Sequence, residues 1–353
     1  MLLHLVFWLP LFASAQQRSA TPNLPGVPEL FRQIQILQHG GRYAEAIPLA
    51  TELLKLREKA LGPKHPDVAS SLNNLALLYV GAAQHQKALP HYERALRICE
   101  EVLGPEHPDT ATTMSNLGRL HTARGDYTKA KALFERALRI REKVLGPQHA
   151  DVAAVLNNLA ALHSQMRDLA TARTLYRKAL AIHEKALGPE HPDTATTIGN
   201  LGTACHELAD PEAEPLLQAT VRIREKVLGP EHPDTALSLA NLASYYTDIG
   251  DYGKADALAQ RALQIREKVL GPDHPLTASS LNTIVNILQR IGDYRRAESS
   301  AERVLQVKEK AFGTEHPELI ESLNNLAFLK LKSARVLTDY LAGVEMYKRA
   351  YRM

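Results

Sequence analysis

A seven-residue phrase that recurs at a nearly constant spacing constrains the fold of this chain more than any other feature. The phrase Leu-Gly-Pro-Lys-His-Pro-Asp first occupies residues 61–67, and its glycine recurs at Gly104, Gly146, Gly188, Gly229, Gly271 and Gly313. Successive glycines are 42 residues apart, except for one spacing of 41 between Gly188 and Gly229. A fixed period of this length indicates a repeat architecture, in which similar units stack in a row.

Each repeat predicts two helices, as residues 66–102 illustrate. Pro66 and Asp67 suit a first helical turn, because the missing proline N–H would have no partner there and the carboxylate complements the helix dipole. Two apolar stripes at helical spacing follow: Leu72, Leu75, Ala76 and Tyr79, then Ala88, Tyr92, Ala95, Leu96 and Cys99. Gly104 can close the second helix in a left-handed conformation, and Pro105 prevents its continuation.

Leu and Ala must provide most of the packing, because aromatic residues make up only 5% of the chain. Both residues have a high helix propensity. The sequence therefore predicts an all-α fold, a right-handed superhelical solenoid of stacked antiparallel helix pairs. We expect the array to span 28–335 with about eight helix pairs, the first and last of them atypical, and a C-terminal capping helix to span 336–353.

The packing positions resemble the tetratricopeptide repeat pattern. One repeat reads Leu75-Ala76-x2-Tyr79 and then Ala88-x3-Tyr92-x2-Ala95; the next reads Leu117-Gly118-x2-His121 and then Ala130-x3-Phe134-x2-Ala137. The 42-residue period, the Gly-Pro-x-His-Pro-Asp linkers and the Leu-Asn-Asn-Leu-Ala phrase are similar to the kinesin-light-chain class of these repeats. The given residues contain neither the heptad coiled coil of kinesin light chains nor the caspase-like domain of some bacterial arrays, so the resemblance implies a fold and leaves the biological role open.

In the resembled family, the first helix of each pair lines a concave groove, and an asparagine on it hydrogen-bonds the ligand backbone. The resemblance implies a groove row at one equivalent position, where Thr283 stands once: Asn74, Asn116, Asn158, Asn200, Asn241 and Asn325. An amide suits this task because it both donates and accepts. The alternative is that these asparagines bridge neighbouring helices, since asparagine in a helix interior needs a hydrogen-bond partner.

Charged residues three and seven positions after the asparagines would tune the choice of ligand. They include Arg119, Glu207, Asp248 and Arg290. Glu207 and Asp248 could attract a basic segment, and Arg290 an acidic one. Scattered surface charge is the simpler alternative.

Other features argue against a catalytic, metal-binding or nucleic-acid-binding role. One His-Pro histidine per repeat cannot gather the several ligands that a metal ion requires, so these histidines are expected to serve helix entry. The phrase Arg141-Glu142-Lys143 is expected to be a solvated helix end, and Cys205 a buried, inert thiol. A net charge of +3 from 42 basic and 39 acidic residues does not favour nucleic acid. The sequence thus predicts a non-catalytic scaffold for a protein or extended peptide, without a cofactor or metal.

The N-terminal segment resembles an export signal. An apolar run over 2–12 precedes Ala13-Ser14-Ala15, the pattern of a cleavage site, although no Lys or Arg precedes the run. The run is shorter than the roughly 20 residues of a membrane span. We expect a signal peptide over 1–15, a flexible linker over 16–27 and an exported protein. The alternative is a cytoplasmic cargo or assembly adaptor resembling kinesin light chain.

The 41-residue repeat departs from the others. One residue is missing near its inter-helix turn, where Asp210-Pro211-Glu212 replaces the Gly-Asp-Tyr of other repeats. Asp210 could cap the second helix, with Pro211 in its first turn. We expect locally altered curvature in this repeat.

Overall fold

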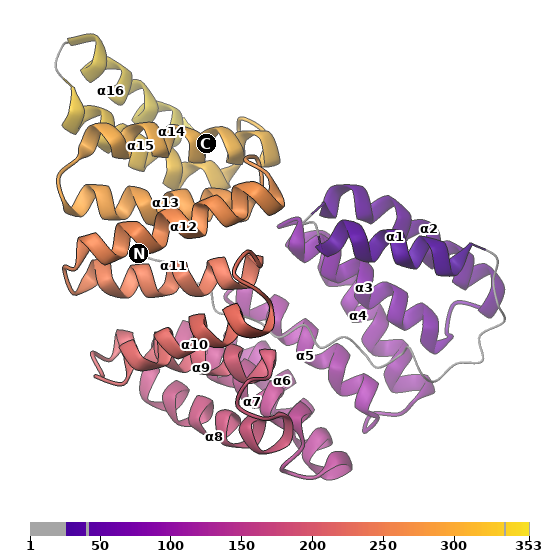
Figure 1. The fold of residues 1–353 in the computed structure, drawn as a ribbon. Coiled ribbons are helices and arrows are strands. Elements are labelled where there is room, and N and C mark those ends of the chain that lie inside the picture. Colours follow the sequence, from indigo (N-terminus) through magenta and orange to yellow (C-terminus); the bar gives the residue numbers. More distant parts are fainter. Residues whose placement is uncertain (1–25, 40–41, 335–336, 353) are drawn as a thin grey trace. The chain divides into compact units, whose positions relative to one another are not determined.

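The computed structural model describes residues 26–39, 42–334 and 337–352. Within these ranges the chain forms sixteen α-helices, one 3-10 helix and no strand (Figure 1). The expected all-α class is therefore confirmed. The expected signal peptide and nearly all of the expected linker lie outside the described residues. No described helix combines the length and apolarity needed to cross a bilayer.

The chain divides into two compact units, residues 1–213 and 214–353. Unit 1 contains α1 (Val27–His39), α2 (Tyr43–Leu61), α3 (Pro66–Gly81), α4 (His85–Val102), α5 (Pro108–Ala123), α6 (Tyr127–Leu145), α7 (Ala150–Gln165), α8 (Leu169–Leu187) and α9 (Pro192–Glu207). Unit 2 contains α10 (Ala213–Val227), whose first residue closes unit 1, then α11 (Pro233–Asp248), α12 (Tyr252–Leu270), α13 (Pro275–Arg290), α14 (Tyr294–Phe312), α15 (Ile320–Ser333) and α16 (Leu337–Arg352).

Within each unit, consecutive helices pack as antiparallel pairs (Figure 1). Second helices also pack against the first helix of the next repeat, as α4 does against α5 and α12 against α13. The first helices contact one another directly, α5 against α7 and α7 against α9 in unit 1, and α11 against α13 in unit 2. A short 3-10 turn, Pro317–Leu319, precedes α15 and replaces the regular helix start of the earlier repeats.

The recurring histidines begin the first helices. In six repeats the histidine Nδ1 accepts a hydrogen bond of 3.1 Å from the backbone N–H two residues later: His65, His107, His149, His191, His232 and His274. This bond satisfies one of the donors that a helix start leaves unpaired. The prediction that these histidines serve helix entry is confirmed.

Two kinds of residue occupy the tight turns. At helix ends the glycines have left-handed backbones, as at Gly104 with a φ of 100°. In the turns between paired helices, Gly125, Gly250 and Gly292 are likewise left-handed. The corresponding residues in three other repeats have side chains and positive φ: Ala83 at 56°, Arg167 at 64° and Ala209 at 54°. A side chain in this region crowds the backbone, so these three turns are strained.

A large side chain in the second helix fills the space between paired helices in unit 1. Tyr92, Phe134 and Tyr176 are fully buried at equivalent positions of α4, α6 and α8. Gly118 on α5 makes room for Phe134, because a Cβ there would lie 2.8 Å from the ring. In unit 2 the equivalent position is Ala259, so the aromatic anchor of the repeat is not obligatory.

The 41-residue repeat starts its second helix later than expected. The Asp210 side chain accepts from the Glu212 N–H at 3.0 Å, and the Asp210 carbonyl accepts from the Ala213 N–H at 3.1 Å. These bonds close a turn over Asp210 to Glu212, so α10 begins at Ala213 and has only 15 residues. The expected first-turn position of Pro211 is therefore wrong. Altered curvature stays a prediction.

Candidate functional site

All ten residues of the predicted groove lie on first helices. They are Asn74 on α3, Asn116 and Arg119 on α5, Asn158 on α7, Asn200 and Glu207 on α9, Asn241 and Asp248 on α11, Arg290 on α13 and Asn325 on α15. We call the first-helix face the surface formed by this asparagine row and its neighbours, taken separately in each unit. The two units expose their rows to different degrees.

In unit 1, three asparagines of the row are buried. Asn116, Asn158 and Asn200 are 2%, 0% and 6% exposed, whereas Asn74 is half-buried. Asn116 Nδ2 donates to Asn73 Oδ1 at 3.1 Å, and Asn200 Nδ2 donates to Asn157 Oδ1 at 3.1 Å. These bonds join successive first helices, as the bridging alternative describes. Ligand binding by these three residues stays a prediction.

Asn158 differs from its two neighbours in the row. The equivalent of Asn73 in the preceding helix is Ser115, whose hydroxyl donates to the Ala111 carbonyl at 2.9 Å. Among the described residues, neither Oδ1 nor Nδ2 of Asn158 has a hydrogen-bond partner. Burial of an unpaired amide costs about 1–3 kcal/mol, so this position is a weak point in the amide row.

In unit 2 the equivalent row is accessible. Asn241, Thr283 and Asn325 are each half-buried. Asn325 Oδ1 accepts from Gln289 Nε2 of the preceding first helix at 2.7 Å. This bond holds the amide in place while part of the side chain stays exposed.

An exposed aromatic ring lies one helical turn after Asn325. Phe328 is 39% exposed, and its ring packs edge-on against Tyr294, with the centroids 6.4 Å apart. The ammonium group of Lys332 lies 5.7 Å from the Phe328 centroid, within the range of a cation–π interaction. The first-helix face of unit 2 therefore combines amides, a hydroxyl and an apolar anchor.

The predicted charged residues already face partners in neighbouring repeats. Glu207 forms an ion pair with Arg167 of the preceding repeat. Asp248 Oδ1 lies 3.5 Å from Arg290 Nη2 of the following repeat. Burial lowers the pKa of Arg119 to about 10. Because Glu207 and Asp248 are each paired with a cation, neither carboxylate presents a free negative charge to a basic ligand.

The burial of a row of second-helix arginines was not predicted from the sequence. Arg141 is buried, whereas Lys143 is exposed, so the expectation that Arg141-Glu142-Lys143 is solvated is wrong for its first residue. Arg224 shows the general arrangement: Nη1 donates to the Asp234 carbonyl at 3.0 Å and to Ser238 Oγ at 2.8 Å. Arg57 and Arg266 repeat it with the hydroxyls fourteen residues later, Ser71 and Ser280. The recurrence of a serine fourteen residues after these arginines is the sequence pattern that could have predicted their burial.

A cysteine–carboxylate cluster lies at the variant turn. Ligand atoms of Cys205, Asp210 and Glu212 lie within 4.8 Å of one another. Arg173 binds Asp210 and Arg177 binds Glu212, each at 2.7 Å. Burial raises the pKa of Cys205 to about 11, so the thiol is protonated at neutral pH. The expected burial of this thiol is confirmed, and its inertness stays a prediction.

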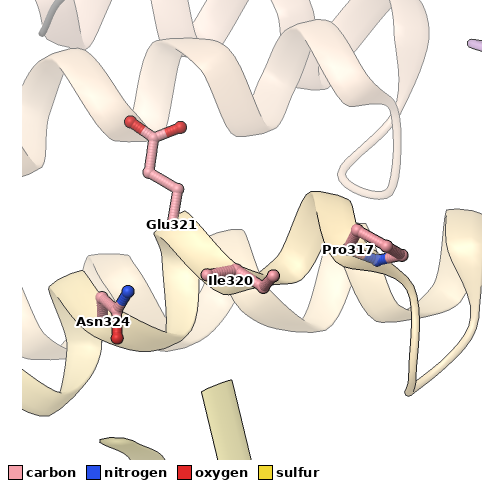
Figure 2. Close-up of a pocket in the computed structure, with 4 residues that line it drawn as sticks. All are labelled: Pro317, Ile320, Glu321 and Asn324. Atoms are coloured by element: carbon pink, nitrogen blue, oxygen red, sulfur yellow. The ribbon is translucent and has the colours of Figure 1, made fainter. Parts of the chain in front are cut away.

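The last helix pair carries two open hollows. The first encloses about 530 Å³ and is lined by Pro317, Ile320, Glu321 and Asn324; the Glu321 side chain points away from the neighbouring side chains (Figure 2). The second has a volume of about 720 Å³; it shares Ile320 and Asn324 with the first and is otherwise lined by residues of α16, among them Tyr347 and Tyr351. Both are shallow surfaces. The single carboxylate of the first hollow has no second titratable group beside it in the lining.

The repeat family is established by comparison. A tetratricopeptide repeat model matches residues 30–101, 81–143, 120–184, 151–213, 210–268 and 246–310. The chain therefore belongs to the tetratricopeptide repeat family, a class of helix-pair scaffolds. Within this family it is similar to kinesin-light-chain-like proteins. A search of curated proteins found no significant match.

Three solved structures illustrate the similarity. A putative kinesin light chain of Podosopora anserina with nearly identical TPR-like repeats is 29% identical, over 58% of this chain and 97% of that one, with a TM-score of 0.47. BtubC (BKLC) from P. vanneervenii is 25% identical, over 69% and 92%, with a TM-score of 0.49. A STAND signal-transduction ATPase with a tetratricopeptide repeat sensor, from Pyrococcus horikoshii, is 14% identical over 93% of this chain and 46% of its own, with a TM-score of 0.57. The last similarity concerns the fold alone.

Proposed function

We propose that this chain is a non-catalytic scaffold that binds an extended segment of a partner protein on the first-helix face of unit 2. The observation that carries the proposal is the half-buried row of Asn241, Thr283 and Asn325 beside the exposed Phe328. The tetratricopeptide repeat fold supports a role in protein interaction. Its elongated stack of first helices suits an extended ligand better than a compact one.

The chemistry of this face defines the ligand. Side-chain amides can pair with both the N–H and the C=O of a peptide main chain, so they hold a segment without reading its sequence. Phe328 offers an apolar contact that would select one aliphatic or aromatic side chain of the ligand. The Asp248–Arg290 pair contributes no net charge. We therefore expect an extended segment with an apolar anchor residue.

Unit 2 is preferred to unit 1 for a physical reason. In unit 1 the amides of Asn116 and Asn200 already bond the preceding first helices. A ligand that used them would have to replace those bonds. Asn241 is reached without that exchange, because it is partly exposed. Asn325 is also partly exposed, and its Nδ2 stays available while its Oδ1 accepts from Gln289.

The cellular location is also a proposal. The leader-like residues 1–15 support export of the mature protein. Sequencing the N-terminus of the protein isolated from its native host tests this. A terminus just after Ala15 is expected, whereas retention of Met1 would favour the cytoplasmic adaptor.

Peptide selection on the full-length protein tests the binding surface. Peptides that bind the chain are selected from a random library, and their affinities are measured for Phe328→Ala, Asn325→Ala and the control Lys310→Ala. Lys310 is exposed on the second helix α14, so it reports any general effect of a surface substitution. We expect Phe328→Ala to weaken binding about 10-fold or more and Lys310→Ala to leave it unchanged. Equal affinities for all three variants would refute the proposed surface.

A further inference from the structure

The guanidinium of Arg266 is buried at the junction of α12 and α13. It is 1% exposed. Its Nη1 donates to the Leu276 carbonyl and to Ser280 Oγ, each at 2.8 Å. Arg224 makes the same pair of bonds one repeat earlier, to the Asp234 carbonyl and to Ser238 Oγ. The two arginines therefore occupy equivalent positions, and their surroundings can be compared directly.

Arg266 lacks the aspartate that follows its equivalents in the first turn of the next helix. An aspartate lies ten residues after each of the other three arginines of the row: Asp67, Asp151 and Asp234. Arg141 forms an ion pair with its aspartate, and the aspartates of Arg57 and Arg224 favour the charged form of those arginines. Leu276 holds this position after Arg266 and carries no charge. Asp234, which follows Arg224, is the carboxylate that acts on the Arg266 charge, and its own side chain is 44% exposed.

Three nitrogen atoms at this junction have no acceptor. Among the described residues, Nε and Nη2 of Arg266 and Nε2 of His274 are buried and unpartnered. The His274 Nδ1 accepts from the Leu276 N–H at 3.1 Å, so a neutral ring must carry its proton on Nε2. Burial and the nearby Arg266 lower the pKa of His274, which favours that neutral ring. All three unpartnered atoms are therefore hydrogen-bond donors.

Buried donors of this kind are normally satisfied, and a buried charge is costly when its counter-charge is partly solvated, as Asp234 is. The positive end of the α13 dipole adds to the positive potential, because Arg266 bonds Leu276 in the first turn of that helix. Arg266 and His274 are 1% and 9% exposed, so a group that binds between them must be small. A negatively charged acceptor satisfies both the charge and the donors, whereas water satisfies only the donors.

We propose that a small monovalent anion of the size of chloride binds at the α12–α13 junction, between Nε and Nη2 of Arg266 and Nε2 of His274. The anion takes the place of the aspartate that the other repeats supply. It completes the core of unit 2 and is independent of the peptide-binding surface.

Chloride-dependent stability of the full chain tests the proposal. Thermal unfolding is measured while sodium gluconate is replaced by sodium chloride at constant ionic strength, so that general screening stays the same. We expect chloride to raise the Tm of the wild-type chain by about 2–4 °C, since the folded state alone holds the site. Leu276→Asp supplies the missing carboxylate and should abolish this dependence.

A matched variant in unit 1 controls for indirect effects. Arg57→Met removes an arginine of the same row that has its own aspartate, so this variant should be less stable but keep the full response to chloride. Crystals of the full chain soaked in bromide should show an anomalous peak beside Arg266. A wild-type chain without chloride dependence, an unchanged dependence in Leu276→Asp, or a water molecule beside Arg266 in place of bromide would each overturn the proposal.

Discussion

The guanidinium of Arg224 shows, at the scale of single residues, how this chain accommodates a buried charge. Its donors bond a carbonyl and a hydroxyl of the next helix, and the carboxylate of Asp234 favours its charged form. A buried charge is tolerated when partners of this kind are present. Arginines nearer the surface of the second helices differ, since pairs such as Arg261–Glu225 are partly exposed and contribute about 1 kcal/mol or less.

Backbone strain at Ala83 gives a prediction at the same scale. Ala83 has a φ of 56°, whereas its neighbour Ala82 has a φ of −83°. Ala83→Gly should raise the free energy of unfolding by about 0.5–1 kcal/mol, because glycine removes the left-handed strain at a smaller entropic cost. Ala82→Gly should lower it by a similar amount, because only the entropic cost remains. Urea unfolding of both variants measures the difference; a loss of stability in Ala83→Gly would contradict the strain.

At the scale of helices, pairing depends on matched sizes across the two members of a pair. Gly118 on α5 and Phe134 on α6 are in close contact, and both belong to the tetratricopeptide pattern. Where unit 2 has Ala259, the helices pair around a smaller side chain. All these repeats therefore keep the helix pairing, whereas the side chain that fills the space between the two helices differs from repeat to repeat.

Substitution of Gly118 tests this pairing. Gly118→Ala places a Cβ 2.8 Å from the Phe134 ring and should cost about 1–3 kcal/mol of stability through overpacking. Gly253 on α12 is the control, because a Cβ there meets no atom closer than 3.9 Å. Gly253→Ala should be neutral or stabilise by up to about 1 kcal/mol. Thermal unfolding measures both, and equal effects of the two variants would disprove the close fit.

The α8–α9 junction should respond to pH through His183. This ring is buried at the position where four other repeats have arginine, with Nδ1 2.9 Å from Thr197 Oγ1, and it lies near the carboxylates of Asp193 and Asp151 and the ring of His191. Burial lowers its pKa below 6.5. Below pH 6.5 the unfolded chain takes up a proton that the folded chain refuses, so His183 reduces stability as the pH falls from 6.5 toward its folded pKa.

His183→Arg removes this titration. The arginine would find Thr197 and Asp193 at the spacings that partner Arg224. Stability measured by urea unfolding between about pH 7.5 and 5 should fall less steeply in the variant than in the wild type. Identical slopes would mean that His183 does not titrate differently in the folded state.

The sequence predicts the helices well because the signals for them are local. The His-Pro linkers, the left-handed glycines and the apolar stripes each act within one or two turns. The buried Arg141 was missed because a short Arg-Glu-Lys phrase does not show which residue faces the next helix. Likewise, the hydrogen bond from the Asn116 side chain to the Asn73 side chain joins residues 43 positions apart, so it depends on how successive first helices stack. The late start of α10 depends on hydrogen bonds to the side chain and the carbonyl of Asp210.

At the scale of the whole molecule, the chain consists of two compact units, and the boundary between them in the sequence falls within the irregular 41-residue repeat. The same asparagine row serves different ends in them. In unit 1, Asn116 and Asn200 are buried and bond the preceding first helices, whereas the row in unit 2 remains partly exposed beside Phe328. The row could be predicted from the sequence, whereas its burial could not, because burial depends on how closely successive first helices pack.

Hydrogen exchange on the full chain, with and without a selected peptide, tests the proposed binding surface most directly. The peptide should slow amide exchange in the first helices α11, α13 and α15 of unit 2, because they form the proposed surface. Exchange in the outer faces of α12 and α14 should change less. Slowed exchange confined to second helices, or to unit 1, would contradict the account.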